Sequence, residues 1–193
     1  MLRFIASGMG VLACASLLLL AKQPDAPSPE KSSRGAKVAI PQMEPRPEDV
    51  STIDGMVRAY YEVVSGPAEK KREWGRDSTL YLPGIRFLIF REGKDGKTSV
   101  RTLTHQEFVD DFEAAMAGKA LYEREVHRIA HRAGDVVHLL STAEQKYSPD
   151  GPVEGRSIDS LEMYWDGSRW WITTASIWEV ETKAHPLNKE FLP

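Results

Sequence analysis

The last third of the chain, residues 121–182, alternates apolar and polar side chains in four long runs separated by glycine-containing turns. A period of two is the pattern of β-strands whose two faces meet different surroundings. The predicted strands cover residues 122–132, 136–147, 157–165 and 169–181. They exceed the usual strand length of about five or six residues, so their twist accumulates and the sheet must curl. The inner face of such a sheet has to be covered by helices.

A first covering helix is predicted just before a glycine–proline stop. Ser51 and Asp54 fit a pattern in which side chains cap a helix N-terminus, and apolar residues recur behind them at helical spacing to Val64. Gly66 and the proline after it end this helix.

A second covering helix begins at Thr104, whose spacing to Glu107 is that of a capping box, and ends at Gly118. Between the two helices, shorter strands are predicted at residues 80–82, 85–91 and 100–103. The predicted fold class is therefore α+β, with a strongly curved antiparallel sheet that forms a cone covered on its inner face by two or three helices.

The register of the last two strands depends on their turn. If Asp166 and Gly167 form a two-residue turn, the helix-covered face carries the apolar set Leu161, Met163, Trp165, Trp170 and Ile172. The same register places Asp159 on that face, beside Thr174 and Ser176.

The opposite face is more apolar than a sheet facing water requires, because it carries Ile158, Tyr164, Trp171, Ala175 and Ile177. Two explanations stay open. A bulge within residues 173–176 would change the register, or a second subunit would cover the outer face. We favour the second and expect a homodimer through this outer face.

The N-terminus has the pattern of an export signal or a membrane anchor. In residues 1–21, Arg3 precedes an apolar run that lies near the lower limit of about 18 residues for crossing a bilayer. The surroundings of Cys14 faintly resemble an acylation site, so cleavage, retention and lipidation all stay open. We expect an exported protein, periplasmic, secreted or membrane-tethered, that meets a membrane only through this segment if it is not cleaved.

Composition defines the rest of the chain. Residues 22–48 hold six of the twelve prolines and no apolar period, which predicts a disordered linker, and residues 49–193 have the size of one domain. The only cysteine lies in the signal, so disulfides and thiolate chemistry are not expected in the domain. The net charge of −3 argues against nucleic-acid binding, which favours a basic surface.

The capped helices and the terminal meander of long strands resemble the nuclear transport factor 2-like superfamily, also described as the SnoaL-like or ketosteroid isomerase-like cone fold. Residues 65–68 with Trp74 and Asp77, the Asp166–Gly167 turn with the tryptophans after it, and the tail ending at Pro193 look like exported members. The resemblance spans residues 49–193 and implies the fold. Because the superfamily holds isomerases, dehydratases, cyclases and non-enzymatic binding domains, it implies no single function.

Asp159 is the candidate catalytic residue. Its neighbours on the same strand face are apolar, and burial would raise the pKa of its carboxyl toward the range useful for a general base. The alternative is that Thr174, Ser176 or a water satisfies it structurally.

Aromatic side chains at helix and strand positions are candidates for lining an apolar pocket, and ordinary core packing is the alternative. The candidate pocket residues are Tyr60, Trp74, Phe87, Phe112, Tyr164 and Trp178.

A charged ladder on the first long strand, Glu123, Glu125, His127 and His131, is predicted to share one face. We interpret it as a solvated or paired surface, with a pocket wall containing an acid–base pair as the alternative. The two histidines lie about 13 Å apart in a strand, so no metal site is predicted. No dinucleotide or phosphate-binding motif is present, and no cofactor is expected.

From the sequence we expect a domain that binds a small apolar ligand or a protein partner without catalysis. The alternative is an isomerase, dehydratase or cyclase that uses Asp159.

Overall fold

The computed structural model describes residues 37–93, 95–181 and 186–193, and for residues 178–180 it describes the backbone only. The predicted signal and most of the predicted linker lie outside these ranges. Within the described ranges, no helix combines the length and the hydropathy of a membrane span.

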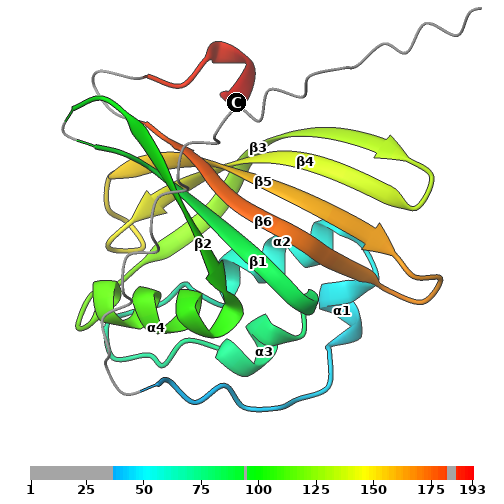
Figure 1. Ribbon diagram of the computed structural model, residues 1–193. Helices are drawn as coiled ribbons and strands as arrows, with labels where there is room; N and C mark the ends of the chain where they lie inside the picture. The colour runs from blue at the N-terminus through cyan, green and yellow to red at the C-terminus, as the bar shows by residue number, and fades with distance from the viewer. Residues whose placement is uncertain (1–36, 94, 182–185) are drawn as a thin grey trace, which may run out of the picture. The chain divides into compact units, whose positions relative to one another are not determined.

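Six strands form one strongly curved sheet in the order β2–β1–β6–β5–β4–β3 (Figure 1). Their bounds are β1 Tyr81–Glu92, β2 Thr98–Thr104, β3 Tyr122–Ala133, β4 Val136–Lys146, β5 Gly155–Trp165 and β6 Trp170–Val180. All neighbouring pairs are antiparallel except β1 and β6, which run parallel. The predicted meander of four long strands is confirmed. The two short strands predicted before residue 92 form one strand with an irregularity between Tyr81 and Arg86.

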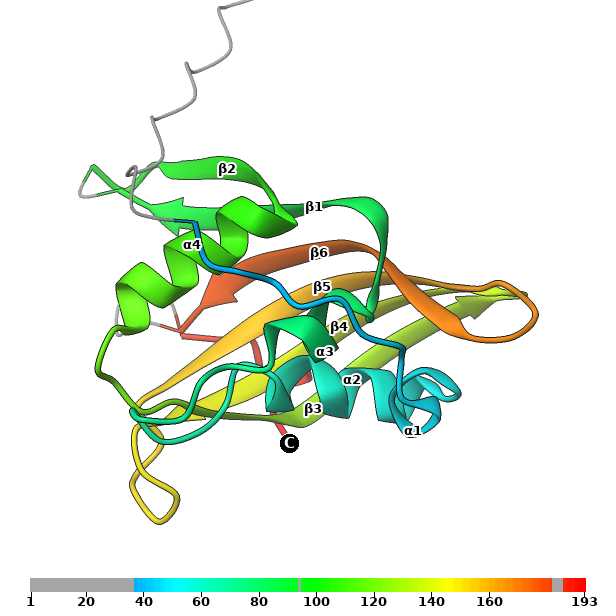
Figure 2. The ribbon, with the colours of Figure 1, turned by 90° about the horizontal axis from the view of Figure 1, so that it is seen from below.

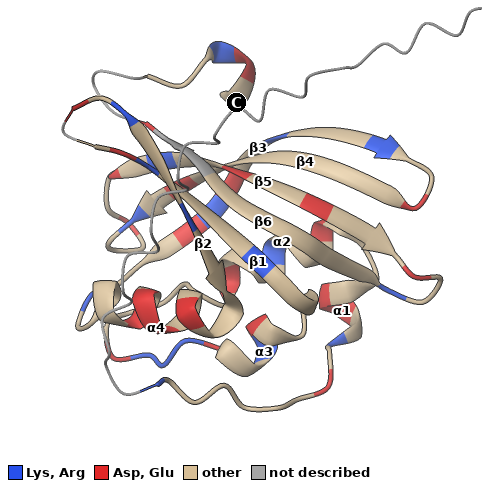
Figure 3. Ribbon diagram, in the orientation of Figure 1, with Lys and Arg blue, Asp and Glu red and all other residues tan. Residues whose placement is uncertain are grey.

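In the described part of the chain, four α-helices lie on one side of this sheet, and Figure 2 shows them in front of its inner face. They are α1 Pro47–Val50, α2 Ile53–Glu62, α3 Trp74–Ser78 and α4 His105–Met116, and a 3-10 helix η1 spans Lys189–Phe191. Contacts join α2 to β3 and α4 to β1 and β2. Figure 3 shows acidic positions along α4, which contains no lysine or arginine. The predicted fold class, a curved sheet with helices over its inner face, is confirmed.

The two helix caps test local sequence signals. The box between Thr104 and Glu107 is confirmed, because each residue's backbone N–H donates to the other's side chain, at 2.8 and 3.2 Å. At α2 the predicted cap is wrong by one residue. Thr52 has the extended backbone that a cap needs, and its Oγ1 accepts from Gly55 N at 2.9 Å. Asp54 instead pairs with Arg128 at 2.7 Å.

The hairpin between β5 and β6 differs from its predicted register. Trp165 pairs with Trp170, so four residues, and not two, form the loop between them. A bulge at Thr173 then leaves Glu162 opposite Thr174 but Met163 opposite Ile172. The extra residue reverses the alternation of β6 from Thr174 to Ile177, and a further register shift follows opposite Ile158 and Asp159.

This bulge brings apolar residues of β6 inside. Ala175 is buried in the core, and Ile177 packs against the core. The prediction that both residues lie on the outer face is therefore wrong. Ile158 keeps its outer position but is buried, and η1 packs against β3 and β4 on that side, where Phe191 O accepts from Thr142. The bulge explains much of the predicted apolar excess, and the homodimer stays a prediction.

A bulge also lies in β3. Glu125 pairs with Ala143 and His127 with Thr142, so Val126 is the extra residue. The predicted ladder on one face is therefore wrong. Glu123 and Glu125 lie on the inner face with the buried residues of β4, whereas the two histidines of the ladder turn to the outer face.

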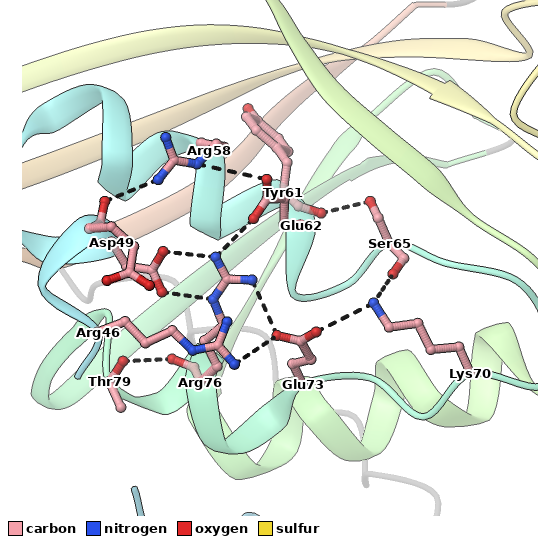
Figure 4. A network of polar contacts seen from close by, with 11 residues as sticks. Arg46, Asp49, Arg58, Tyr61, Glu62, Ser65, Lys70, Glu73, Arg76 and Thr79 are labelled. Atoms are coloured by element: carbon pink, nitrogen blue, oxygen red, sulfur yellow. Dashed lines mark hydrogen bonds and ion pairs between the residues drawn. The ribbon is translucent and has the colours of Figure 1, made fainter. Parts of the chain in front are cut away.

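The segment before α2 is anchored by a buried ion pair (Figure 4). Arg76 donates to both oxygens of Asp49 at 2.7 Å, and it also contacts Glu62 at 2.8 Å and Glu73 at 3.2 Å. Upstream, Val38 N donates to the Asp110 carboxylate on α4. The folded unit thus begins before residue 49, and the predicted boundary falls inside α1.

Removing one partner of this pair tests the anchor. Asp49 is fully buried, so Asp49→Asn leaves a buried guanidinium without its main counter-ion and should lower the free energy of unfolding by about 3 kcal/mol in urea titrations. The matched change Asp54→Asn removes a pair whose carboxylate is 87% exposed and should change stability by less than about 1 kcal/mol. Equal effects of the two changes would contradict the anchoring role.

Candidate functional site

A cavity of about 60 Å³ lies between the helices and the inner face of the sheet. Its described lining is Tyr60, Val64, Tyr81, Phe108, Phe112, Glu123, Gln145, Ser157, Asp159 and Ile177. Aromatic side chains from α2, β1 and α4 face polar side chains from β3, β4 and β5. The cavity therefore has an apolar roof and an acidic floor.

Asp159 is the most unusual residue of this floor. Its side chain is 5% exposed, and its Oδ1 atom has no hydrogen-bond partner among the described residues. Burial, and then the negative charge of Glu123, raise the pKa of Asp159 from 3.8 to about 8, although the polar hydroxyls of Tyr61 and Tyr60 nearby oppose the change. At neutral pH this carboxyl is mainly protonated.

Glu123 is the second acid of the floor. Burial raises its pKa from 4.5 to about 7, while a hydrogen bond from Gln145 and the positive charge of Arg72 oppose the shift. Two neighbouring carboxyls that both hold protons near neutral pH are characteristic of functional sites, because structural carboxylates are normally paired.

The register explains why Asp159 is inside. It lies opposite Ser141 of β4 and Ile177 of β6, both on the inner face. The predicted partners Thr174 and Ser176 do not contact it, because the bulge at Thr173 moves them to the outer face.

A hydrogen-bonded chain flanks Asp159 on one side. The Tyr61 hydroxyl donates to Ser141 Oγ at 2.9 Å, and Ser141 donates to Glu125 at 2.6 Å. Arg128 holds Glu125 from the other side at 2.5 Å. Since these groups satisfy one another, none of them supplies a counter-ion to Asp159.

On the other side, Tyr81 donates to Asp77 Oδ1 at 2.8 Å, and His105 Nε2 shares a hydrogen bond with Asp77 Oδ2 at 2.6 Å. Burial and the charge of Asp77 raise the pKa of Tyr81 well above its usual value. Burial and the charge of Asp159 do the same for Tyr60. Both phenols therefore stay neutral at physiological pH.

The predicted pocket residues divide into two groups. Tyr60 and Phe112 line the cavity. Phe87 is fully buried behind it, stacked on Phe108 with ring centres 4.4 Å apart, and does not border the space.

The other three predicted pocket residues are elsewhere or undescribed. Trp74 donates to Glu113 at 2.6 Å and borders a separate open groove of about 680 Å³ that Met43 also lines. Tyr164 is 41% exposed on the outer face, because it alternates with the buried Met163 along β5. The side chain of Trp178 lies outside the described residues.

Sequence reasoning missed several lining residues. Phe108 lies within the predicted second covering helix, and Ser157 shares the strand face of Asp159, so both carried a usable signal. Tyr81 and Gln145 carried no such signal, since strand pairing across the sheet is what brings them to the cavity.

The described part of the chain holds no cluster of three or more His, Cys, Asp or Glu side chains suited to a metal ion.

The chain matches no family model and no curated protein in sequence. Similar solved structures include an NTF2-like protein of unknown function from Silicibacter pomeroyi, 12% identical, with a TM-score of 0.45 over 65% of this chain and 91% of its own. An NTF2-like protein from Cytophaga hutchinsonii is 15% identical, with a TM-score of 0.37 over 51% of this chain and 75% of its own. A protein from Kribbella flavida is 12% identical, with a TM-score of 0.42 over 64% and 86%. No residue role passes from these proteins to this chain.

The pH dependence of stability tests the state of Asp159. Since its folded pKa lies above its ordinary value, its contribution is full below about pH 4 and is lost as the pH rises toward about 8. The free energy of unfolding should therefore fall over this range by at least about 2 kcal/mol more in the unmodified chain than in Asp159→Asn, which has no such carboxyl.

The matched control is Asp150→Asn on an exposed loop, which should keep the slope of the unmodified chain. Glu123→Gln should flatten the slope less than Asp159→Asn, because the pKa of Glu123 is raised less, from 4.5 to about 7. An unchanged slope in Asp159→Asn would contradict the raised pKa.

Proposed function

We propose that this chain is a binding domain that holds one small, largely apolar molecule in the cavity, with its polar end at Asp159 and without catalysis. The observation that carries the proposal is the unpartnered Oδ1 of a buried carboxyl bordering an aromatic-lined space. Buried polar atoms normally have partners, so a ligand atom is the natural occupant of this position.

The size of the cavity limits the ligand. A water occupies roughly 10–15 Å³ in the same measure, so about 60 Å³ accommodates about four water-sized groups. An engineered apolar cavity that binds benzene has a volume of about 150 Å³. The enclosed part of the ligand therefore has only a few non-hydrogen atoms, and a larger molecule must extend past Phe112 or displace its ring.

The energetics also support binding. An uncompensated buried carboxyl destabilises the fold at neutral pH, and an isosteric amide would remove this effect. Residues that weaken a fold locally are concentrated at functional sites. Export of the domain, proposed from residues 1–21, and the homodimer through the outer face are further parts of this proposal.

Small probes test the binding. Titration of the chain with acetone, ethanol, acetate and ethylammonium should give saturable NMR shifts of the Val64 and Ile177 methyl groups with at least one probe, because both residues line the cavity. Val64→Phe fills the space and should abolish the shifts of the Ile177 methyl groups, whereas Val153→Phe in an exposed loop should not. Absence of shifts with every probe, and of any co-purifying small molecule in native mass spectrometry, would overturn the proposal.

A second candidate function is proton transfer by Asp159, in an isomerase, dehydratase or cyclase. It is favoured by the pKa of about 8, which suits a general acid or base near neutral pH. Acetone fits the cavity by size, so this function predicts accelerated deuterium exchange of its methyl protons in heavy water, followed by NMR. Asp159→Asn should reduce the rate at least about 100-fold. An equal rate in the variant would exclude Asp159 as the base.

A further inference from the structure

We propose that the group held in this cavity is a small alkylammonium ion, clasped between acidic and aromatic side chains. This inference rests on the proposed function of the cavity and narrows it to one class of ligand. The side chains assigned to the ion are Asp159, Glu123, Tyr60, Tyr81, Phe108 and Phe112.

The first argument is charge. Among the described residues that line the cavity, two are acidic and none is lysine, arginine or histidine. A cation placed between two carboxyls favours their ionised forms and supplies the counter-charge that the protein does not.

The cations nearby are already engaged. Arg72 donates to the backbone oxygens of Gly66 and Lys119 at 3.1 and 3.2 Å. Arg128 pairs with Glu125 and with Asp54 of α2.

His105 shares its hydrogen bond with Asp77, so it too has an acidic partner. Neither carboxyl of the cavity floor has a cationic side chain in contact among the residues that the structure describes.

The second argument is the aromatic roof. Among the described lining residues, four carry aromatic rings. Aromatic rings attract ammonium ions through their negative faces, most strongly where water is excluded. Phe108 and Phe112 lie on the same side of α4 with ring centres 6.0 Å apart. A neutral polar ligand would gain nothing comparable from these rings.

The third argument is the field of α4, the helix that carries two of these rings. It contains four acidic residues and no lysine or arginine (Figure 3). Asp111 pairs with Arg101, but Glu113 and Asp110 are bound by the neutral donors Trp74 Nε1 and Val38 N. The helix therefore keeps a net negative charge beside the site, which attracts cations and repels anions.

Size then selects the ion. Ethylammonium has three non-hydrogen atoms and fits the available volume of about 60 Å³. For a ligand of this size the expected dissociation constant is no tighter than roughly 0.5 mM. The same ammonium group can also be the end of a longer chain that leaves the cavity past Phe112.

Binding is predicted to be linked to protons. Asp159 and Glu123 bind protons with pKa values of about 8 and about 7 in the free protein, and the cation lowers both. The ion should therefore bind more tightly as the pH rises from 6 to 8, with release of protons near neutral pH.

The experiment is a titration of the full chain with ethylammonium chloride, followed by NMR and calorimetry at constant ionic strength set with sodium chloride. We expect saturable binding at least 10-fold tighter than that of ethanol, its neutral isostere, and no binding of acetate. Calorimetry in buffers of different ionisation enthalpy should show release of about one proton per ion at pH 7. A parallel titration with 1,5-diaminopentane distinguishes a free small ion from the end of a longer amine.

Two aspartate-to-asparagine variants test whether the Asp159 carboxyl binds the ion. Asp159→Asn keeps the shape, should be more stable than the unmodified chain at neutral pH, and should weaken ethylammonium binding at least 10-fold. The exposed Asp150→Asn should leave it unchanged. Ethanol or acetone binding as tightly as ethylammonium, or binding without proton release, would overturn this inference but keep the proposed function. Failure of all probes would overturn both.

Discussion

Two β-bulges, at Val126 of β3 and at Thr173 of β6, determine which side chains reach the inner face of this sheet. The bulge at Val126 divides an acidic and histidine-rich strand, so that Glu123 turns inward while the histidines turn out. The bulge at Thr173 reverses β6, so that Ile177 faces Asp159 where a polar neighbour was expected. Because side chains alternate with a period of two, a shift of one residue moves an entire set to the other face. The acidic floor beneath aromatic rings follows from these two positions.

Interactions elsewhere in the fold have to offset the destabilising effect of this acidic floor. Asp159 lies among buried side chains with one oxygen unpartnered, a local arrangement that opposes folding when the carboxyl ionises. The fold compensates elsewhere, through the fully buried Asp49 with its two short contacts to Arg76 and through the capping box that starts α4. The guanidinium of Arg76 contacts three carboxylates, whereas the carboxyl of Asp159 contacts no described cation. This contrast distinguishes the structural polar groups from the candidate functional ones.

The parts of this fold that the sequence predicts are those governed by neighbours in the chain. Strand alternation and the Thr104–Glu107 box depend on contacts within a few residues, and both are found as predicted. The bulges are different, since an inserted residue is stabilised only by the partner strand. The burial of Asp159 was predicted from its apolar face-mates, but its partners were not. Tyr81 and Gln145 reach the cavity only through pairing across the sheet, for which the sequence carries no local signal.

The central claim is that a carboxyl is held protonated beneath the helices at neutral pH. Carbon-13 NMR of aspartate side-chain carboxyls, with Asp159 assigned by its loss in Asp159→Asn, measures this directly as the pH is raised. The account predicts that the Asp159 resonance titrates with a pKa near 8. A titration of Asp159 near 4 would show an ionised, solvated side chain and would contradict the site described here.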